Sequence, residues 1–169
     1  AKQKQEESGG LSADNTSAEN HCTVFTISES PLSSHIIWAG TDDGNLQVTT
    51  DGGKSWANVS SNYVSAGIPA QTWISSIEPS RFDSNAVFAT FDNHMYGDHK
   101  SYVAKSNDMG KTWTLLKGGE EMEGFAHKIK EDLVNKDLLF VGTEMGLYGS
   151  VYGGKEWFRM KNNIPWYTP

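Results

Sequence analysis

Acidic and imidazole side chains that could act on a ligand recur in a few short polar segments of the chain. Paired carboxylates can serve as acid and base at a glycosidic bond, and carboxylates mixed with imidazoles can hold a metal ion or hydrogen-bond a ligand. The segments GTDDGN, FDNHMYGDHKSY and GTEMG supply Asp42, Asp43, Asp92, His94, Asp98, His99 and Glu144. The spacing of the middle set matches no recognised metal-ligand motif, so we favour solvated loop residues there and expect no metal and no cofactor.

Composition limits which partners are plausible. The 169 residues include 14 Lys and Arg against 21 Asp and Glu, which gives a net charge of −7 and argues against binding a nucleic-acid backbone. Mean hydropathy is −0.53, and no apolar run approaches the roughly 20 residues of a membrane-spanning helix. A single cysteine, Cys22, excludes a multi-cysteine metal site. The compartment stays open, and a secreted or periplasmic location is compatible with the sequence.

The elements that must position these side chains form an internal repeat of about fifty residues. The copies run over 27–56, 77–113 and 129–157, and each contains apolar runs such as IIWAG, AVFAT and LLFVG between polar turns. Short apolar runs of this kind predict strands, and four strands at this period predict a β-propeller blade. We therefore expect an all-β fold with an incomplete ring of about three blades over 21–169, preceded by a polar extended lead-in over 1–20.

A glycine-rich turn that ends in tryptophan closes each repeat. Two copies, TTDGGKSW and SNDMGKTW, supply Thr49, Asp51, Gly53 and Trp56, and Ser106, Asp108, Gly110 and Trp113. Asp and Ser or Thr can hydrogen-bond backbone N–H groups in a tight turn, glycine accepts positive φ, and tryptophan packs on a neighbouring blade. The pattern resembles the Asp-box, or BNR repeat, in which these residues are structural. The third copy, SVYGGKEW, has Tyr152 where the aspartate belongs.

The chain from about residue 18 to 169 resembles large bacterial BNR-repeat proteins of the glycosyl hydrolase-like or sortilin-like kind. The segments AENHCTVFTISESP, WISSIEPSRFD, GFAHKIKEDLVN and LLFVGTEMGLY carry the resemblance, together with the Asp-box turns. It implies that the chain is a fragment of a longer propeller. Three blades do not close a ring, so missing sequence, another chain or a second copy of this chain must cover the exposed blade edges.

Successive turns of an up-and-down blade alternate between two ends, so the polar segments above are expected at one end with the links between blades. The links add His21, Trp73 and His127. His21 and His127 are interpreted either as buried inner-strand residues or as site residues. Trp73 either stacks on a sugar ring or packs between blades, and packing is favoured.

The residues expected at this end of the blades suggest two functions. The preferred one is a non-catalytic module that binds a protein or a glycan. The alternative is part of a glycoside hydrolase with Asp42 in its cleft, because Thr41-Asp42-x-Gly44 resembles the TDxGG segment of xyloglucan-cleaving propellers, although Asn45 replaces its second glycine. Asp42 and Asp43 otherwise simply favour a hairpin turn. The sequence argues against a sialidase for this segment, because sialidases resemble one another in a three-arginine clamp and this chain has two arginines.

Overall fold

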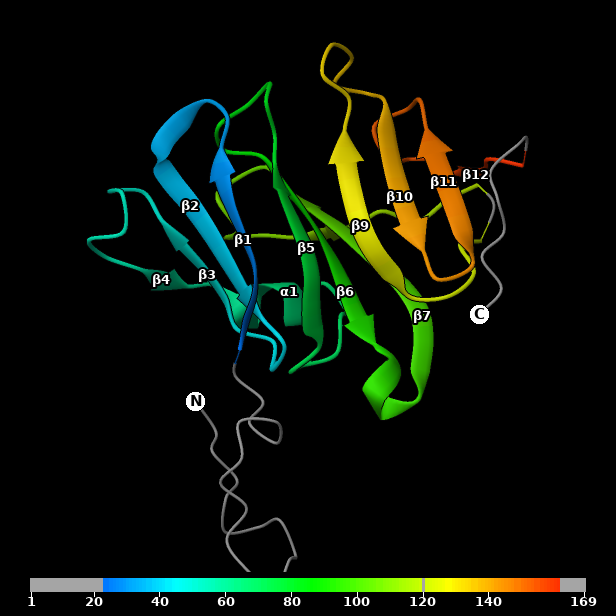
Figure 1. The fold of residues 1–169 in the computed structure, drawn as a ribbon, viewed down its shortest axis with the longest axis horizontal. Coiled ribbons are helices and arrows are strands. Elements are labelled where there is room, and N and C mark those ends of the chain that lie inside the picture. Colours follow the sequence, from blue (N-terminus) through cyan, green and yellow to red (C-terminus); the bar gives the residue numbers. More distant parts are fainter. Residues whose placement is uncertain (1–22, 120, 162–169) are drawn as a thin grey trace, which may run out of the picture.

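The computed structural model describes residues 23–119 and 121–161, and these residues form three four-stranded antiparallel sheets (Figure 1). Strand order within each sheet follows the chain, so each sheet is an up-and-down meander. This confirms the all-β fold with three propeller blades. Residues 1–20 and His21 lie outside the described residues.

Each blade has three longer strands and a two-residue outer strand. Blade 1 contains β1 (Val24–Ser30), β2 (Ser33–Thr41), β3 (Leu46–Thr49) and β4 (Ala57–Asn58). Blade 2 contains β5 (Trp73–Pro79), β6 (Val87–Asn93), β7 (Asp98–Ser106) and β8 (Thr114–Leu115). Blade 3 contains β9 (Ala126–Glu131), β10 (Leu139–Thr143), β11 (Gly146–Ser150) and β12 (Phe158–Arg159).

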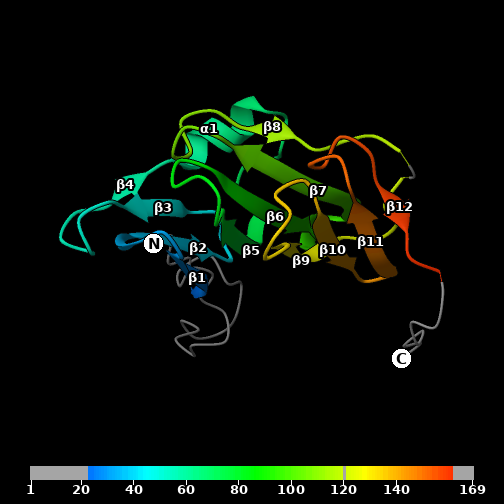
Figure 2. The same cartoon turned by 90° about the horizontal axis from the view of Figure 1, so that it is seen from above.

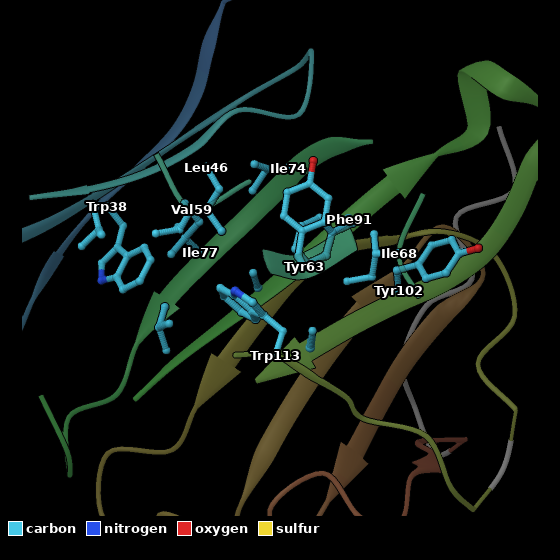
Figure 3. Packing of buried hydrophobic residues seen from close by; sticks show 14 residues of the cluster. Trp38, Leu46, Val59, Tyr63, Ile68, Ile74, Ile77, Phe91, Tyr102 and Trp113 are labelled. Atoms are coloured by element: carbon cyan, nitrogen blue, oxygen red, sulfur yellow. The ribbon is translucent and has the colours of Figure 1, made fainter. Parts of the chain in front are cut away.

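The blades pack through their sheet faces, with the first strands β1, β5 and β9 side by side (Figure 1). Figure 2 shows the three sheets from the end where β1 turns into β2. One core cluster joins blades 1 and 2 and contains Trp38, Ile77 and Trp113 (Figure 3). A second joins blades 2 and 3 and contains Phe88 and Ile129. Burial of these apolar faces is the main force that holds one blade on the next.

Two short helices interrupt the strands and were not expected from the sequence. Helix α1 (Ser60–Ser65) lies in the link between blades 1 and 2, and the 3-10 helix η1 (His94–Tyr96) lies in the β6–β7 hairpin. The α1 residue Tyr63 is buried, and its hydroxyl donates to the carbonyl of Gly44 at 2.7 Å. Burial, assisted by the negative charge of Asp43, raises the pKa of Tyr63 to about 12. Six residues are too few to show helical periodicity, so α1 leaves no clear pattern in the sequence. No helix in the described part of the chain is long and apolar enough to cross a membrane.

The two glycine-rich turns with aspartate have the same internal hydrogen bonds. The Asp51 carboxylate accepts from the Ser55 hydroxyl at 2.6 Å, the Ser55 N–H at 2.9 Å and the Thr49 hydroxyl at 2.7 Å. These bonds, the Ser55 hydroxyl first, lower the pKa of Asp51 to about 2. Asp108 makes the equivalent bonds with Thr112 and Ser106, and its pKa is also lowered, mainly by the Thr112 hydroxyl. Both carboxylates are therefore occupied within their own turns.

The third turn keeps part of this bonding without an aspartate. The Ser150 hydroxyl oxygen accepts from the N–H groups of Tyr152 at 3.3 Å and Gly154 at 3.0 Å. Thr49 and Ser106 accept from Gly53 and Gly110 in the same way, both of which have positive φ. The hydroxyl and the glycine are thus common to all three turns, which explains how the loop shape survives the loss of the carboxylate.

Candidate functional site

A row of aromatic rings crosses all three blades at one end of the molecule. This end, here called the hairpin end, holds the β2–β3, β6–β7 and β10–β11 hairpins and lies at the bottom of Figure 1. Ring centroids are 4.6 Å apart for Phe25 and Trp73, 6.2 Å for Trp73 and His94, 4.7 Å for His94 and Phe125, and 4.9 Å for Phe125 and His127. We call these five residues the aromatic row.

Bulges near the starts of β1 and β9 present two members of this row, whereas the equivalent bulge in β5 leaves Ser75, which is not part of the row. In β1 the pairing with β2 shifts between Val24 and Thr26, which leaves Phe25 as an extra residue. In β9 the pairing with β10 passes from Lys128 to Ala126 and leaves His127 extra in the same way. A β-bulge re-aims the extra side chain and bends the strand. Phe25 is 53% exposed and His127 is also exposed, whereas Trp73 and Phe125 are half-buried.

A buried carboxylate orients the histidine in the middle of the row. Asp92 Oδ1 accepts from the His94 N–H at 2.9 Å and lies 2.6 Å from His94 Nδ1. The Asp92 side chain is 4% exposed and that of His94 is 36% exposed. Because a carboxylate only accepts, this contact places the proton of a neutral ring on Nδ1 and leaves Nε2 as an acceptor. The His94 ring then stacks on Phe125 with the planes 24° apart.

The carboxylates of the first hairpin are used to hold backbone. Asp42 Oδ1 accepts from the N–H of Thr23 at 2.9 Å, and the N–H of Asp42 donates to the Thr23 carbonyl. Asp43 accepts from the Thr41 hydroxyl and from Asn45 Nδ2. Both aspartates are half-buried. These bonds give each a clear part in shaping the hairpin and tying it to the start of β1.

The remaining residues expected at this end take different positions relative to the row. His99 is exposed, and its ring lies 6.3 Å from that of Phe125. Glu144 is exposed in the β10–β11 hairpin, and its N–H donates to the Phe125 carbonyl at 3.2 Å. Asp98 accepts from the Tyr102 hydroxyl at 2.7 Å; burial opposes ionisation, but this and further hydrogen bonds lower the pKa of Asp98 overall.

The structure therefore brings together Trp73, His94, His99 and His127, which the sequence places at this end. Sequence reasoning missed Phe25 and Phe125, which complete the row. Their signal is faint: Phe25 and His127 occupy equivalent places in their repeats, and Phe125 directly precedes β9. Within the described residues no three His, Cys, Asp or Glu side chains lie close enough to hold a metal ion. A shallow cavity of about 390 Å³ is lined by Asp137, Val151, Tyr152, Lys155 and Glu156, and none of the row lines it.

Comparisons with known proteins give similarity in structure only. No family model matches the chain, and no curated protein matches it. An ancestral GH74 enzyme matches with a TM-score of 0.67 and 22% identity over 85% of this chain and 19% of that chain. YCF48 bound to D1 peptide matches with a TM-score of 0.59 and 18% identity, over 83% of this chain and 40% of that chain.

The GH74 xyloglucanase from Xanthomonas campestris matches with a TM-score of 0.57 and 19% identity, over 81% of this chain and 21% of that chain. The chain thus spans between about a fifth and two fifths of these structures. At such identities the likeness concerns the fold, which agrees with the three blades described above. The chain shares its architecture with a segment of these β-propeller proteins.

Proposed function

We propose that the chain is a segment of a β-propeller that binds a protein or glycan ligand along the aromatic row. The observation that carries this proposal is the row itself: rings from three blades meet at one end, and several of them remain open to solvent. Exposed flat rings offer apolar contact area at low cost in conformational entropy, which suits both sugar faces and peptide side chains.

The polar groups around the row suit hydrogen bonding to such a ligand. His94 is held by Asp92 and offers one ring nitrogen, and the exposed Glu144 and His99 lie on neighbouring loops. Similar structures include one bound to a peptide and one named for xyloglucan cleavage. A propeller hosts many functions, so these names support both ligand classes and select neither.

The glycine-rich turns support a relationship with Asp-box, or BNR, propellers of the glycosyl hydrolase-like or sortilin-like kind. Their support is the shared bonding of Asp51 and Asp108 with the hydroxyl four residues later. Under this assignment both aspartates are structural. Ligand contact is then left to the hairpin end.

The second candidate function is a glycoside hydrolase segment with Asp42 as an acid or base. The similarity to GH74 structures favours it. The bond from the Thr23 N–H to Asp42 favours the binding role instead, because it gives Asp42 a structural task. Replacing Asp42 by Asn in the complete propeller tests the hydrolase: loss of sugar release with unchanged folding supports it, and undiminished release removes Asp42 from the mechanism.

Binding at the row is tested with Phe125→Ala and Phe25→Ala, with Phe82→Ala as the matched control. Phe82 is similarly exposed but lies in the β5–β6 turn at the opposite end. Xyloglucan oligosaccharides and a displayed peptide library serve as the two probes, and affinity is measured by titration calorimetry on each probe that binds. A loss of about tenfold or more in both row variants, with Phe82→Ala unchanged, is expected for a binding hot spot. Unchanged affinity in both row variants would remove the row from the binding site.

A further inference from the structure

Equivalent residues of the three repeats differ sharply in exposure. Strand pairing aligns Ile27 opposite Ala39, Ile77 opposite Ala89, and Ile129 opposite Val141. Ile77 is 1% exposed and Ile129 is 0% exposed, whereas Ile27 is 67% exposed. We use "leading face" for the side of a blade that meets the preceding blade. The leading faces of blades 2 and 3 are buried, and that of blade 1 is open.

Other positions of the leading face repeat this contrast. Trp113 is 7% and Trp157 is 2% exposed, but the equivalent Trp56 is 41% exposed. Val24 is mostly exposed, while its equivalents Ile74 and Ala126 are buried. A contiguous exposed patch of large apolar residues, unlike scattered single residues, is typical of a surface that contacts another part of a protein.

The covered faces show what such a partner presents. Trp38, on β2 of blade 1, packs in the cluster with Ile77 (Figure 3). Phe88, on β6 of blade 2, packs in the second cluster with Ile129. Both aromatic residues occupy the same place in their second strands, opposite Ser28 and Glu78 of the first strands. A preceding blade therefore places a large aromatic side chain on the leading isoleucine.

A polar contact accompanies the apolar one between blades 2 and 3. Glu131 is 6% exposed and accepts from the Ser80 hydroxyl at 2.9 Å and from the Arg81 N–H at 2.8 Å. Glu29 of blade 1 is the equivalent of Glu131, because Glu29 follows Ile27 by two residues and Glu131 follows the equivalent Ile129 by two residues. Glu29 is exposed, and no described residue donates a hydrogen bond to its carboxylate. The partner of this face should supply a hydroxyl and a backbone N–H at that point.

Blade 3 does not offer that chemistry to blade 1 of a second copy. Asp132 occupies the place of Ser80, and its carboxylate accepts from the N–H groups of Val134 and Asn135. Those bonds lower the pKa of Asp132. An ionised carboxylate cannot donate, and beside Glu29 it would place two like charges together.

We propose that the leading face of blade 1 is the docking surface for a further propeller blade that differs from blade 3 of this chain. That blade carries an aromatic side chain at the Trp38 position and a serine or threonine at the Ser80 position. The Glu29 carboxylate accepts from this hydroxyl and from the following N–H. The proposal stands apart from the ligand-binding function of the hairpin end.

The test uses two full-length variants that can pair in only one direction. A donor chain carries Ile27→Lys, which blocks its own leading face, together with Asp132→Ser, which supplies the missing hydroxyl. An acceptor chain carries Phe140→Lys at the place on β10 that corresponds to Phe88, so that only its leading face remains able to dock. Phe140→Ala is a second acceptor if lysine disturbs folding, and circular dichroism verifies every variant. Affinity is measured by analytical ultracentrifugation of the mixed chains.

The donor with Asp132→Ser is expected to bind at least tenfold more tightly than the donor with native Asp132, since a charge-assisted hydrogen bond replaces a like-charge contact. Glu29→Ala in the acceptor should abolish this advantage, and Glu144→Ala, an exposed carboxylate at the hairpin end, should preserve it. Equal affinity of the two donors would overturn the proposal and make a second copy an adequate partner. Absence of binding by the Asp132→Ser donor would also overturn it, because the face would then not accept a blade.

Discussion

Three repeat-equivalent isoleucines provide a test of how burial between blades determines stability. Ile77→Ala removes side-chain carbons from a site that is 1% exposed, and such a change costs about 2–5 kcal/mol through lost transfer energy and cavity formation. Ile129→Ala should cost a similar amount. Ile27 is 67% exposed, so about a third of its area leaves water on folding, and Ile27→Ala should cost less than about 1 kcal/mol.

Urea unfolding, followed by circular dichroism and tryptophan fluorescence, measures these differences. With an m-value of about 2 kcal/mol/M, the midpoint should fall by about 1–2.5 M for Ile77→Ala and by under about 0.5 M for Ile27→Ala. Coincident transitions from the two probes are needed before the midpoints are converted to free energies.

The reasoning is refuted if Ile27→Ala lowers the midpoint as much as Ile77→Ala at low protein concentration. Such a result would mean that Ile27 is covered within the single chain. A loss that grows with protein concentration would instead reveal association of chains through this face.

Three further changes test individual contacts. Asp51 has a pKa of about 2 in the folded chain against an ordinary 3.8. Its contribution to stability is therefore present above about pH 4 and is lost as the pH falls towards 2. Asp51→Asn should flatten this part of the stability–pH curve, measured by thermal unfolding. Gly44→Ala should lower the free energy of unfolding in urea by over about 2 kcal/mol, because φ is +83° and a Cβ atom would lie 2.6 Å from Gln71 Cα. Gly53→Ala, where φ is +91° but the space around a Cβ atom is open, should cost about 1 kcal/mol. Equal costs for the two variants would contradict the steric argument. Glu131→Ala leaves buried donors unpaired and should cost about 1–3 kcal/mol in the same assay, and a neutral result would show that water replaces the carboxylate.

The repeat predicted much of the fold because blade strands are short, apolar and separated by polar turns. The third copy, which begins at Ile129, was expected to contain strands like the other two, and β9 (Ala126–Glu131) lies at its start. Helix α1 could not be foreseen, because its stability comes from burial of Tyr63 rather than from periodicity.

The candidate site was predictable in part. Alternation of turns between two ends placed Trp73, His94 and His127 at the same end, and the contacts of the row agree with this. Phe25 was missed because a bulge shifts the two-residue alternation of a strand by one position, and nothing in the local sequence marks that shift. The bonds of Asp42 were also invisible, since they depend on where Thr23 lies in the fold.

The junction between blades 1 and 2 lacks the polar contact found at the next one, because Pro79 stands where Glu131 stands in blade 3. Ser30 and Ser80 nevertheless lie in equivalent turns, and each hydroxyl oxygen accepts a hydrogen bond from the N–H of the residue two positions later. Blade 1 would offer Glu131 of blade 3 the hydroxyl but not the second donor, because Pro31, which has no N–H, stands where Arg81 stands in blade 2. The order of blades is therefore favoured by this hydrogen bond as well as by connectivity, since the link through α1 keeps blade 2 at a high local concentration beside blade 1. During refolding at high protein concentration, blade 2 of another copy offers Glu131 the same two donors, so exchange of blade 2 between chains is the expected route to misassembly.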